Sequence, residues 1–147
     1  MLKKLNSINL LLVVICVFCT LTSFAKTYGN VKCTYIKNYD GDTITVNIPN
    51  YPAIIGKNIS IRVNGIDTPE LRTKSPKEKQ LARTAKRIVK NLLKNAKVIE
   101  LKNMQRGKYF RVVADVYYDG KKLADILIKN KLAVPYDGGT KTKNWSE

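Results

Sequence analysis

Short segments that alternate between apolar and polar residues constrain the fold of this chain more than any other feature. In "TITVNI" (Thr43–Ile48) every second residue is apolar, which is the period-2 pattern of a half-buried strand. Similar reasoning predicts further strands at Val31–Asn38, Ile59–Val63, Val98–Lys102 and Arg111–Tyr118. Five strands this short bury their apolar faces most readily by curling into a small barrel with helices packed against it.

One long helix is predicted between the third and fourth strands. Ser75 is a natural N-cap, Pro76 fits the first helical position, and Glu78 completes a capping box. An apolar stripe then recurs at helical spacing, formed by Leu81, Ala85, Ile88, Leu92 and Ala96 and widened by Ala82, Val89 and Leu93. A short second helix is predicted around Leu123 to Lys129, so the fold class is α+β.

The segments between these elements contain two turn signals. Residues 51–58, "YPAIIGKN", are predicted to form a loop, and Gly65 interrupts the third strand as a β-bulge would. No repeat, low-complexity tract or linker divides the chain.

The first 25 residues have the pattern of a secretory signal peptide. Lys3 and Lys4 precede an apolar run, and Ser23-Phe24-Ala25 offers a small-x-small cleavage site. An uncleaved membrane anchor is the alternative reading. We expect residues 26–147 to form a single domain that is secreted or periplasmic, monomeric, and without stable membrane association after cleavage.

The charge balance points to a polyanionic partner. The chain has 27 lysine and arginine residues against 11 acidic ones, a formal net charge of +16. Nucleic acid is the first candidate and an anionic membrane surface the second, while a generically basic secreted protein remains an alternative. Only Cys33 lies in residues 26–147, which excludes an internal disulfide and a thiol-based metal site there.

The chain contains no histidine, so any hydrolysis depends on carboxylates, a metal, lysine, tyrosine or arginine. Two acidic clusters are candidates: Asp40 and Asp42 flank Gly41, and "DTPE" spans residues 67–70. Each reads on its own as a turn or capping motif. Brought together, Asp42, Asp67 and the Thr68 carbonyl would offer an all-oxygen site suited to Ca²⁺ or Mg²⁺.

Two arginines accompany these acids. Arg62 lies on the polar face of the third strand, and Arg111 begins the last strand. Guanidinium groups bind phosphate oxygens through two parallel hydrogen bonds, which lysine cannot imitate. Two arginines facing an acidic metal site are costly unless a phosphate binds there.

These motifs together resemble the staphylococcal nuclease (thermonuclease) family in order and approximate spacing. The resemblance covers roughly Thr34 to Tyr136. It rests on Asp40-Gly41-Asp42-Thr43, on Arg62 with Asp67-Thr68-Pro69-Glu70, and on Lys108-Tyr109-Phe110-Arg111.

The resemblance implies a five-stranded oligonucleotide-binding (OB-fold) barrel with one long and one short helix. It also implies a Ca²⁺-dependent phosphodiesterase that hydrolyses DNA and RNA and leaves 3′-phosphate ends. By position, the implied calcium ligands are Asp42, Asp67 and Thr68, with Asp40 nearby. The implied catalytic residues are Arg62, Glu70 and Arg111, and the implied substrate-binding residues are Lys108, Tyr109 and Tyr136.

Two departures from the family pattern stand out. Phe110 occupies a position where the family has glycine, and the residues after Tyr136 are too few and too rich in glycine and threonine for a terminal helix. The alternative function is a non-catalytic nucleic-acid-binding OB-fold protein. A cationic membrane-active protein is a weaker alternative, because the core requires the apolar face of the basic helix.

Overall fold

The structure is a computed structural model that describes residues 28–147. The expected signal peptide, residues 1–25, lies outside the described residues. Within residues 28–147 no helix is both long enough and apolar enough to cross a membrane.

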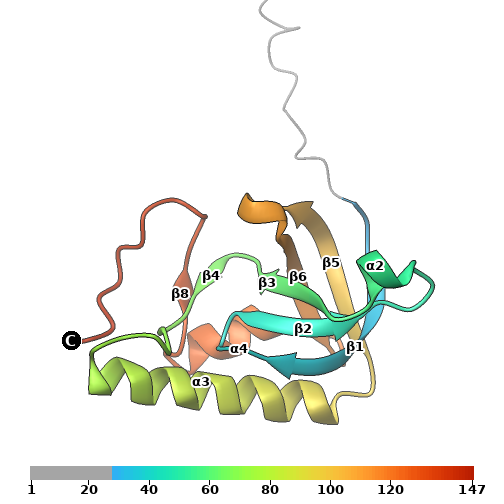
Figure 1. Cartoon of the computed structure of the whole chain (residues 1–147). Coiled ribbons are helices and arrows are strands. Elements are labelled where there is room, and N and C mark those ends of the chain that lie inside the picture. Colours follow the sequence, from blue (N-terminus) through green and yellow to red (C-terminus); the bar gives the residue numbers. More distant parts are fainter. Residues whose placement is uncertain (1–27) are drawn as a thin grey trace, which may run out of the picture.

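Five strands form the closed barrel that the alternation predicts (Figure 1). They are β1 (Val31–Asn38), β2 (Thr43–Asn47), β3 (Ile59–Val63), β5 (Ile99–Arg106) and β6 (Val112–Tyr118). Neighbours are antiparallel in the order β3-β2-β1-β5-β6, and a parallel pairing of β3 with β6 closes the ring. The predicted α+β class and OB-fold barrel are confirmed.

The long helix α3 (Pro76–Asn95) lies along one side of the barrel (Figure 1). Its start is as predicted, because the Ser75 hydroxyl accepts a hydrogen bond from the backbone N–H of Glu78 at 3.2 Å. The predicted apolar face packs on the core, where Leu81, Ile88, Leu92 and Ala96 are partly buried. The fully buried side chains of α3 are Ala82, Ala85, Val89 and Leu93.

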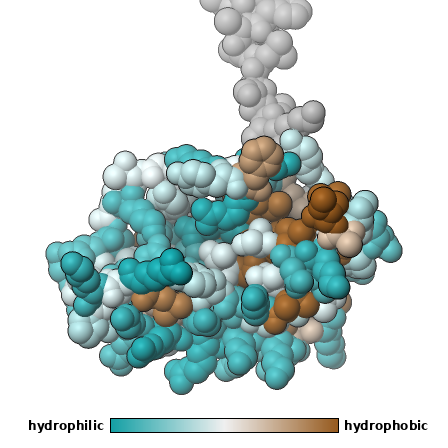
Figure 2. All heavy atoms as spheres, in the orientation of Figure 1, coloured by the Kyte–Doolittle hydropathy of each residue, from teal (hydrophilic) through white to brown (hydrophobic). Residues whose placement is uncertain are grey.

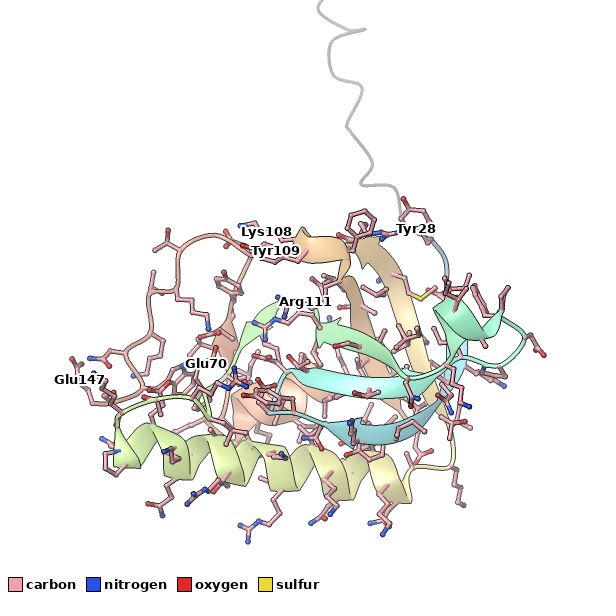
Figure 3. All side chains as sticks on the ribbon, in the orientation of Figure 1. Tyr28, Glu70, Lys108, Tyr109, Arg111 and Glu147 are labelled. Atoms are coloured by element: carbon pink, nitrogen blue, oxygen red, sulfur yellow. The ribbon has the colours of Figure 1, made fainter. Side chains whose placement is uncertain are left out.

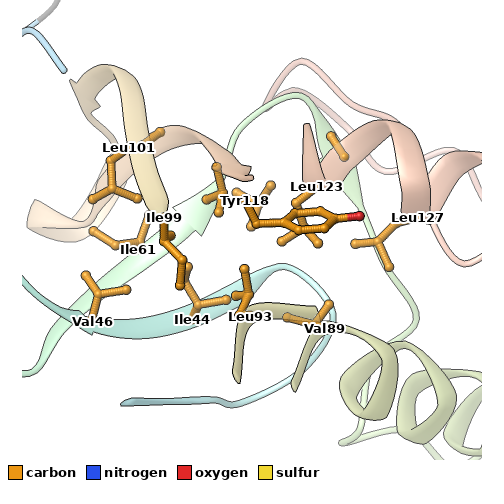
Figure 4. Packing of buried hydrophobic residues seen from close by; sticks show 14 of the residues in the cluster. Ile44, Val46, Ile61, Val89, Leu93, Ile99, Leu101, Tyr118, Leu123 and Leu127 are labelled. Atoms are coloured by element: carbon orange, nitrogen blue, oxygen red, sulfur yellow. The ribbon is translucent and has the colours of Figure 1, made fainter. Parts of the chain in front are cut away.

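The core is formed by the inner faces of the barrel strands and two helices (Figure 4). The second helix, α4 (Leu123–Lys129), has the predicted bounds and buries Leu123 and Leu127. Figure 4 shows these side chains packed with Ile44, Ile61, Leu93 and Leu101. Burial of this apolar surface is the main term that stabilises the barrel.

The turn between β1 and β2 packs closely against α3 and the second acidic cluster. A Cβ atom on Gly41 would lie 2.9 Å from Cγ2 of Thr68 and 3.0 Å from Cβ of Ala85. Glycine is therefore required here by the close approach of three segments. This packing places Thr68 beside Asp42.

Three details differ from the predictions. The structure has a one-turn helix, α2 (Ala53–Gly56), where a loop was expected. Strand β5 continues to Arg106, beyond the predicted end at Lys102. The prediction stopped too early because a register shift between Lys102 and Gln105 interrupts the alternation of apolar and polar residues. Gly65, with a φ of +78°, forms a turn with Asn64 between β3 and β4, and the pairings of β3 contain no register shift of the kind that a bulge produces.

Three two-residue strands complete the sheets: β4 (Ile66–Asp67), β7 (Lys121–Lys122) and β8 (Val134–Pro135). In the pairing of β4 with β8, Asp67 lies opposite Val134. The backbone N–H of Tyr136 then donates to the carbonyl of Gly65 at 3.0 Å. The residues that follow, 136–147, are called the C-terminal segment below, and they begin beside the strand that carries Asp67.

The surface is mostly hydrophilic on the face drawn in Figure 2, as the charge composition leads us to expect. Apolar colour gathers over α2, where Tyr51, Ile54 and Ile55 are exposed. The acidic clusters lie away from this patch.

Candidate active site

The two aspartates of the β1–β2 turn have different structural tasks. One oxygen of Asp40 accepts hydrogen bonds from the backbone N–H groups of Asp42 (3.1 Å) and Thr43 (2.8 Å), so Asp40 caps the turn. Burial raises the pKa of Asp40, although the N–H of Thr43 and the charge of Arg62 oppose that shift and Glu70 adds to it. Asp42 contributes only its backbone N–H to this cap, and its carboxylate accepts hydrogen bonds from the hydroxyls of Thr43 and Thr68.

Asp42 joins the two acidic clusters. Its Oδ2 accepts hydrogen bonds from the backbone N–H (3.1 Å) and the hydroxyl (2.7 Å) of Thr68, which lies 26 residues later in the chain. Both residues are buried, as is Asp67. The structure therefore brings Asp42, Asp67 and Thr68 together, in a place where water competes little for the carboxylates.

Arg62 lies between the two carboxylates. Its guanidinium forms an ion pair with Oδ1 of Asp42, and its NH2 lies 3.7 Å from Oδ1 of Asp67. It also donates to the carbonyl of Ile66 at 3.1 Å. Burial lowers the pKa of Arg62, and the charges of Asp40 and Asp67 oppose this, so the guanidinium stays protonated. It is directed at the acids rather than at open solvent.

The backbone of Glu70 is held by Glu78, which the sequence analysis assigned to the capping box of the long helix. Oε1 of Glu78 accepts a hydrogen bond from the backbone N–H of Glu70 at 3.1 Å, and Oε2 accepts one from the Thr73 hydroxyl at 2.6 Å. The predicted capping box is thus only half right, because the N–H of Ser75 donates to Thr73 instead of Glu78. Glu78 stabilises the loop that carries Glu70.

The C-terminal segment contributes two residues that the sequence analysis missed. Nζ of Lys141 lies 2.6 Å from Oε1 of Glu70 and 2.8 Å from Oδ1 of Asp67. The indole N–H of Trp145 donates to Oδ2 of Asp67 at 3.3 Å. Burial alone would lower the pKa of Lys141, but the close contacts of its ammonium with the Asp67 and Glu70 carboxylates, and their charges, raise it. The presence of a tryptophan in an otherwise polar terminal segment could have predicted that Trp145 is buried. No local sequence pattern identifies Lys141 as a site residue.

The predicted phosphate-binding residues lie at the connection between β5 and β6 (Figure 3). Lys108 and Tyr109 are at its tip in a short 3₁₀ turn, η1 (Lys108–Phe110), and Arg111 follows. Tyr109 and Phe110 are exposed with φ values of +57° and +58°, and the Arg106 guanidinium lies 4.7 Å from the centre of the Phe110 ring. Phe110 thus adopts the left-handed conformation that glycine would favour.

A cleft of about 710 Å³ connects these groups. Of the predicted site residues, its walls include Asp42, Arg62, Glu70, Lys108, Arg111 and Tyr136. Asp67 is buried beside it, next to Lys141, which also lines the cleft. Tyr109 does not line the cleft, and the Tyr136 hydroxyl donates to the carbonyl of Gly139 at 2.7 Å. Acidic and basic groups therefore face the same space from opposite segments.

The donor set around Asp42 and Asp67 fits a hard divalent cation. Oδ1 of Asp67 is the only buried side-chain oxygen or nitrogen of residues 28–147 without a hydrogen bond of acceptable geometry, although the Lys141 ammonium is close to it. Among the same residues no group of three or more histidine, cysteine, aspartate or glutamate side chains is arranged around a metal position. A cation here would be held by two carboxylates supplemented by backbone oxygen.

Comparison with known proteins adds two findings. A family model described as "Staphylococcal nuclease homologue" matches residues 60–146. The chain is also 35% identical over 105 residues to a curated protein, "Endonuclease YncB" of Bacillus subtilis (strain 168). That alignment covers 70% of this chain and 47% of the relative, so the chain spans about half the length of that relative.

Proposed function

The chain belongs to the staphylococcal nuclease homologue family, and we propose that it is a Ca²⁺-dependent nuclease that hydrolyses DNA and RNA. The observation that carries the proposal is the convergence of Asp42 and Asp67, two buried carboxylates from distant segments, on Arg62, which lines a cleft together with Arg111. The formal net charge of +16 supports a polyanionic substrate.

In the proposed reaction, Asp42, Asp67 and the carbonyl of Thr68 would hold Ca²⁺, whose charge offsets the negative charge that develops on the phosphoryl oxygens. Arg62 and Arg111 bind the scissile phosphate, and Lys108 and Tyr109 contact a terminal phosphate of the bound nucleotide. Tyr136, which lines the cleft, is proposed to stack on a base.

Glu70 orients a water molecule and accepts its proton as the water oxygen attacks phosphorus. The bond from phosphorus to the 5′ oxygen breaks and the departing 5′ oxygen takes a proton from solvent water, which leaves a 3′-phosphate on one fragment and a 5′-hydroxyl on the other. Arg62 must release Asp42 before it can bind phosphate, and Glu70 must release Lys141 before it can accept a proton. Both rearrangements replace an internal ion pair by a contact with cation or substrate.

The family is metal-dependent; calcium rather than magnesium is our proposal. Ca²⁺ accepts irregular sets of oxygen ligands, whereas Mg²⁺ requires near-ideal octahedral geometry. We also propose that residues 1–25 are removed after Ala25 and that the protein acts as a secreted or periplasmic monomer. Mass spectrometry of exported protein beginning at Lys26 would support this.

A non-catalytic nucleic-acid-binding protein is the second candidate, and one observation favours it. Arg62 and Lys141 already neutralise the carboxylates that hydrolysis requires. A protein that kept these ion pairs in the presence of substrate would bind nucleic acid without cutting it.

One experiment separates the two candidates. The purified protein is incubated with labelled single-stranded DNA and RNA, either with Ca²⁺ or with excess chelator, and the product ends are analysed. We expect Ca²⁺-dependent cleavage with 3′-phosphate ends, and loss of cleavage in Glu70→Gln. Binding without cleavage in Ca²⁺ would favour the second candidate, and cleavage undiminished by chelator would contradict the metal assignment.

A further inference from the structure

The C-terminal segment returns to the acidic site and contacts it at two points. Figure 1 shows it running from β8 back toward the start of α3. Trp145 is buried although both of its sequence neighbours are exposed, and it is the only tryptophan of the chain. Its indole N–H reaches one oxygen of Asp67, while the Lys141 ammonium reaches the other oxygen and Glu70.

We propose that Trp145 and Lys141 act on the cation site in opposite ways. Trp145 is a positioning residue that fixes the Asp67 carboxylate for cation binding. Lys141 is a resident cation that holds Asp67 and Glu70 in the resting protein and leaves when a divalent cation binds. The inference rests on the proposed function, because it concerns the same carboxylates.

The indole suits the positioning task. A neutral N–H donor bonds one carboxylate oxygen without cancelling the negative charge, so Oδ2 of Asp67 is fixed, while Oδ1 is buried without a hydrogen bond of acceptable geometry and faces the Lys141 ammonium. Trp145 is itself held by burial, with 8% of its surface exposed. Its position is therefore set by packing and does not depend on whether the site is charged or neutralised.

The lysine suits the role of a cation that leaves. Its side chain is 44% exposed, and that of its partner Glu70 is 48% exposed, so this pair is solvated and contributes little to stability. Asp67 is 3% exposed, and its charge would be costly without a nearby cation. A divalent cation that replaces the ammonium attracts the buried Asp67 carboxylate more strongly than a single positive charge does. Its binding also breaks the ion pair between Lys141 and Glu70.

The test compares three variants by calorimetric Ca²⁺ titration at a temperature well below unfolding, without substrate. Trp145→Phe keeps the aromatic packing and removes the donor, and we expect Ca²⁺ to bind about tenfold more weakly. Lys141→Gln removes the competing charge, and we expect Ca²⁺ to bind about three- to tenfold more tightly. Lys90→Gln is the matched control, because it removes the same charge from an exposed position of α3 outside the cleft, and the Ca²⁺ affinity of this variant should equal that of the wild type.

The opposite signs distinguish this inference from simple detachment of the segment, which would shift both variants in the same direction. A second readout is the emission of Trp145, which should change saturably during the Ca²⁺ titration of the wild type and of Lys141→Gln. Wild-type affinity in either variant would overturn the role given to that residue while leaving the calcium site intact. A wild-type protein that binds no Ca²⁺ would overturn the proposed function and this inference together.

Discussion

Replacing Gly41 by alanine would test the packing that brings the two acidic clusters together. The new Cβ would lie 2.9 Å from Cγ2 and 3.1 Å from Cβ of Thr68, and 3.0 Å from Cβ of Ala85. Thr68 and Ala85 are both fully buried, so neither side chain can rotate into free space. The turn must therefore move away from α3, and Asp42 must move with it.

The expected cost combines two opposing terms. Overpacking in a dense core costs about 1–3 kcal/mol, whereas a glycine-to-alanine change recovers roughly 0.4–1 kcal/mol by restricting the unfolded chain. We expect a net loss of about 1–2 kcal/mol, or roughly 3–10 °C in Tm for a domain of this size. Calcium affinity should also fall, because the hydrogen bonds between Thr68 and Asp42 are disturbed.

A double-mutant cycle with Thr68→Ser provides the measurement. Serine keeps the hydroxyl that bonds Asp42 and removes Cγ2, the atom nearest to the added Cβ. Urea unfolding of the wild type, both single variants and the double variant should give a favourable coupling of about 1 kcal/mol. Gly120→Ala is the control: it has φ of +80° and no neighbour within 4 Å, so it should cost about 1 kcal/mol and show no coupling.

The close approach of the turn to Thr68 would be refuted by either of two results. One is a Gly41→Ala protein that melts at or above the wild-type temperature. The other is strict additivity of the effects of Gly41→Ala and Thr68→Ser.

Further predictions concern the arginine, the aromatic turn, the pH dependence and the salt dependence. Arg111→Lys should reduce single-turnover cleavage by on the order of 10³ with little change in oligonucleotide binding, because lysine keeps the charge and loses the paired hydrogen bonds; near-normal turnover would contradict its catalytic role. Phe110→Gly should raise the free energy of unfolding by about 0.5 kcal/mol, because relief of the strained φ of +58° outweighs loss of the exposed contact between the ring and Arg106; unchanged or lower stability in urea would argue against this. Burial acts to raise the pKa of Asp115, but two asparagine amides and Lys122 lower it overall, so this carboxylate stabilises the fold above its unfolded pKa near 4 and ceases to do so as pH falls through its lower folded pKa. Asp115→Asn should therefore flatten the acid limb of a plot of unfolding free energy against pH, and an unaltered limb would exclude Asp115 as a contributor. Oligonucleotide affinity should fall steeply between low and physiological salt, because bound lysines and arginines release counterions, and a flat dependence in an anisotropy titration would assign the charge excess to another purpose.

The barrel was predictable because its strands each bury one face. The alternation of β2 and β3, and the N-terminal signals Ser75 and Pro76 of α3, are local patterns with a direct physical cause. Strand β5 was underestimated because Asn103 has φ of +51° at an irregularity where the alternation fails. A local pattern identifies regular structure and loses it where the backbone departs from regularity.

The candidate site was predictable only in part. Asp42, Asp67 and the two arginines were found from their residue types and their positions beside predicted strands, and the resemblance to a known family added roles for Glu70, Lys108, Tyr109 and Tyr136. Glu78 was assigned to the helix start, although its carboxylate serves the Glu70 loop eight residues earlier. Trp145 contacts Asp67 across 78 positions, a distance in sequence at which neither propensity nor periodicity carries information. Such contacts depend on the finished fold.

The parallel pairing of β3 with β6, which closes the barrel and is called the seam here, affects the order of folding. The hairpin of β1 and β2 and the helix α3 can form from neighbouring residues, whereas the seam joins Ile61 to Val112 and Val63 to Ala114. Closing a long loop costs entropy before its contacts repay it, so we expect this seam to form late in folding. Arg62 lies within the seam, opposite Val113. A refolding chain should therefore acquire its arginine-lined cleft only when the barrel closes, and recovery of phosphate binding after dilution from denaturant would time that closure directly.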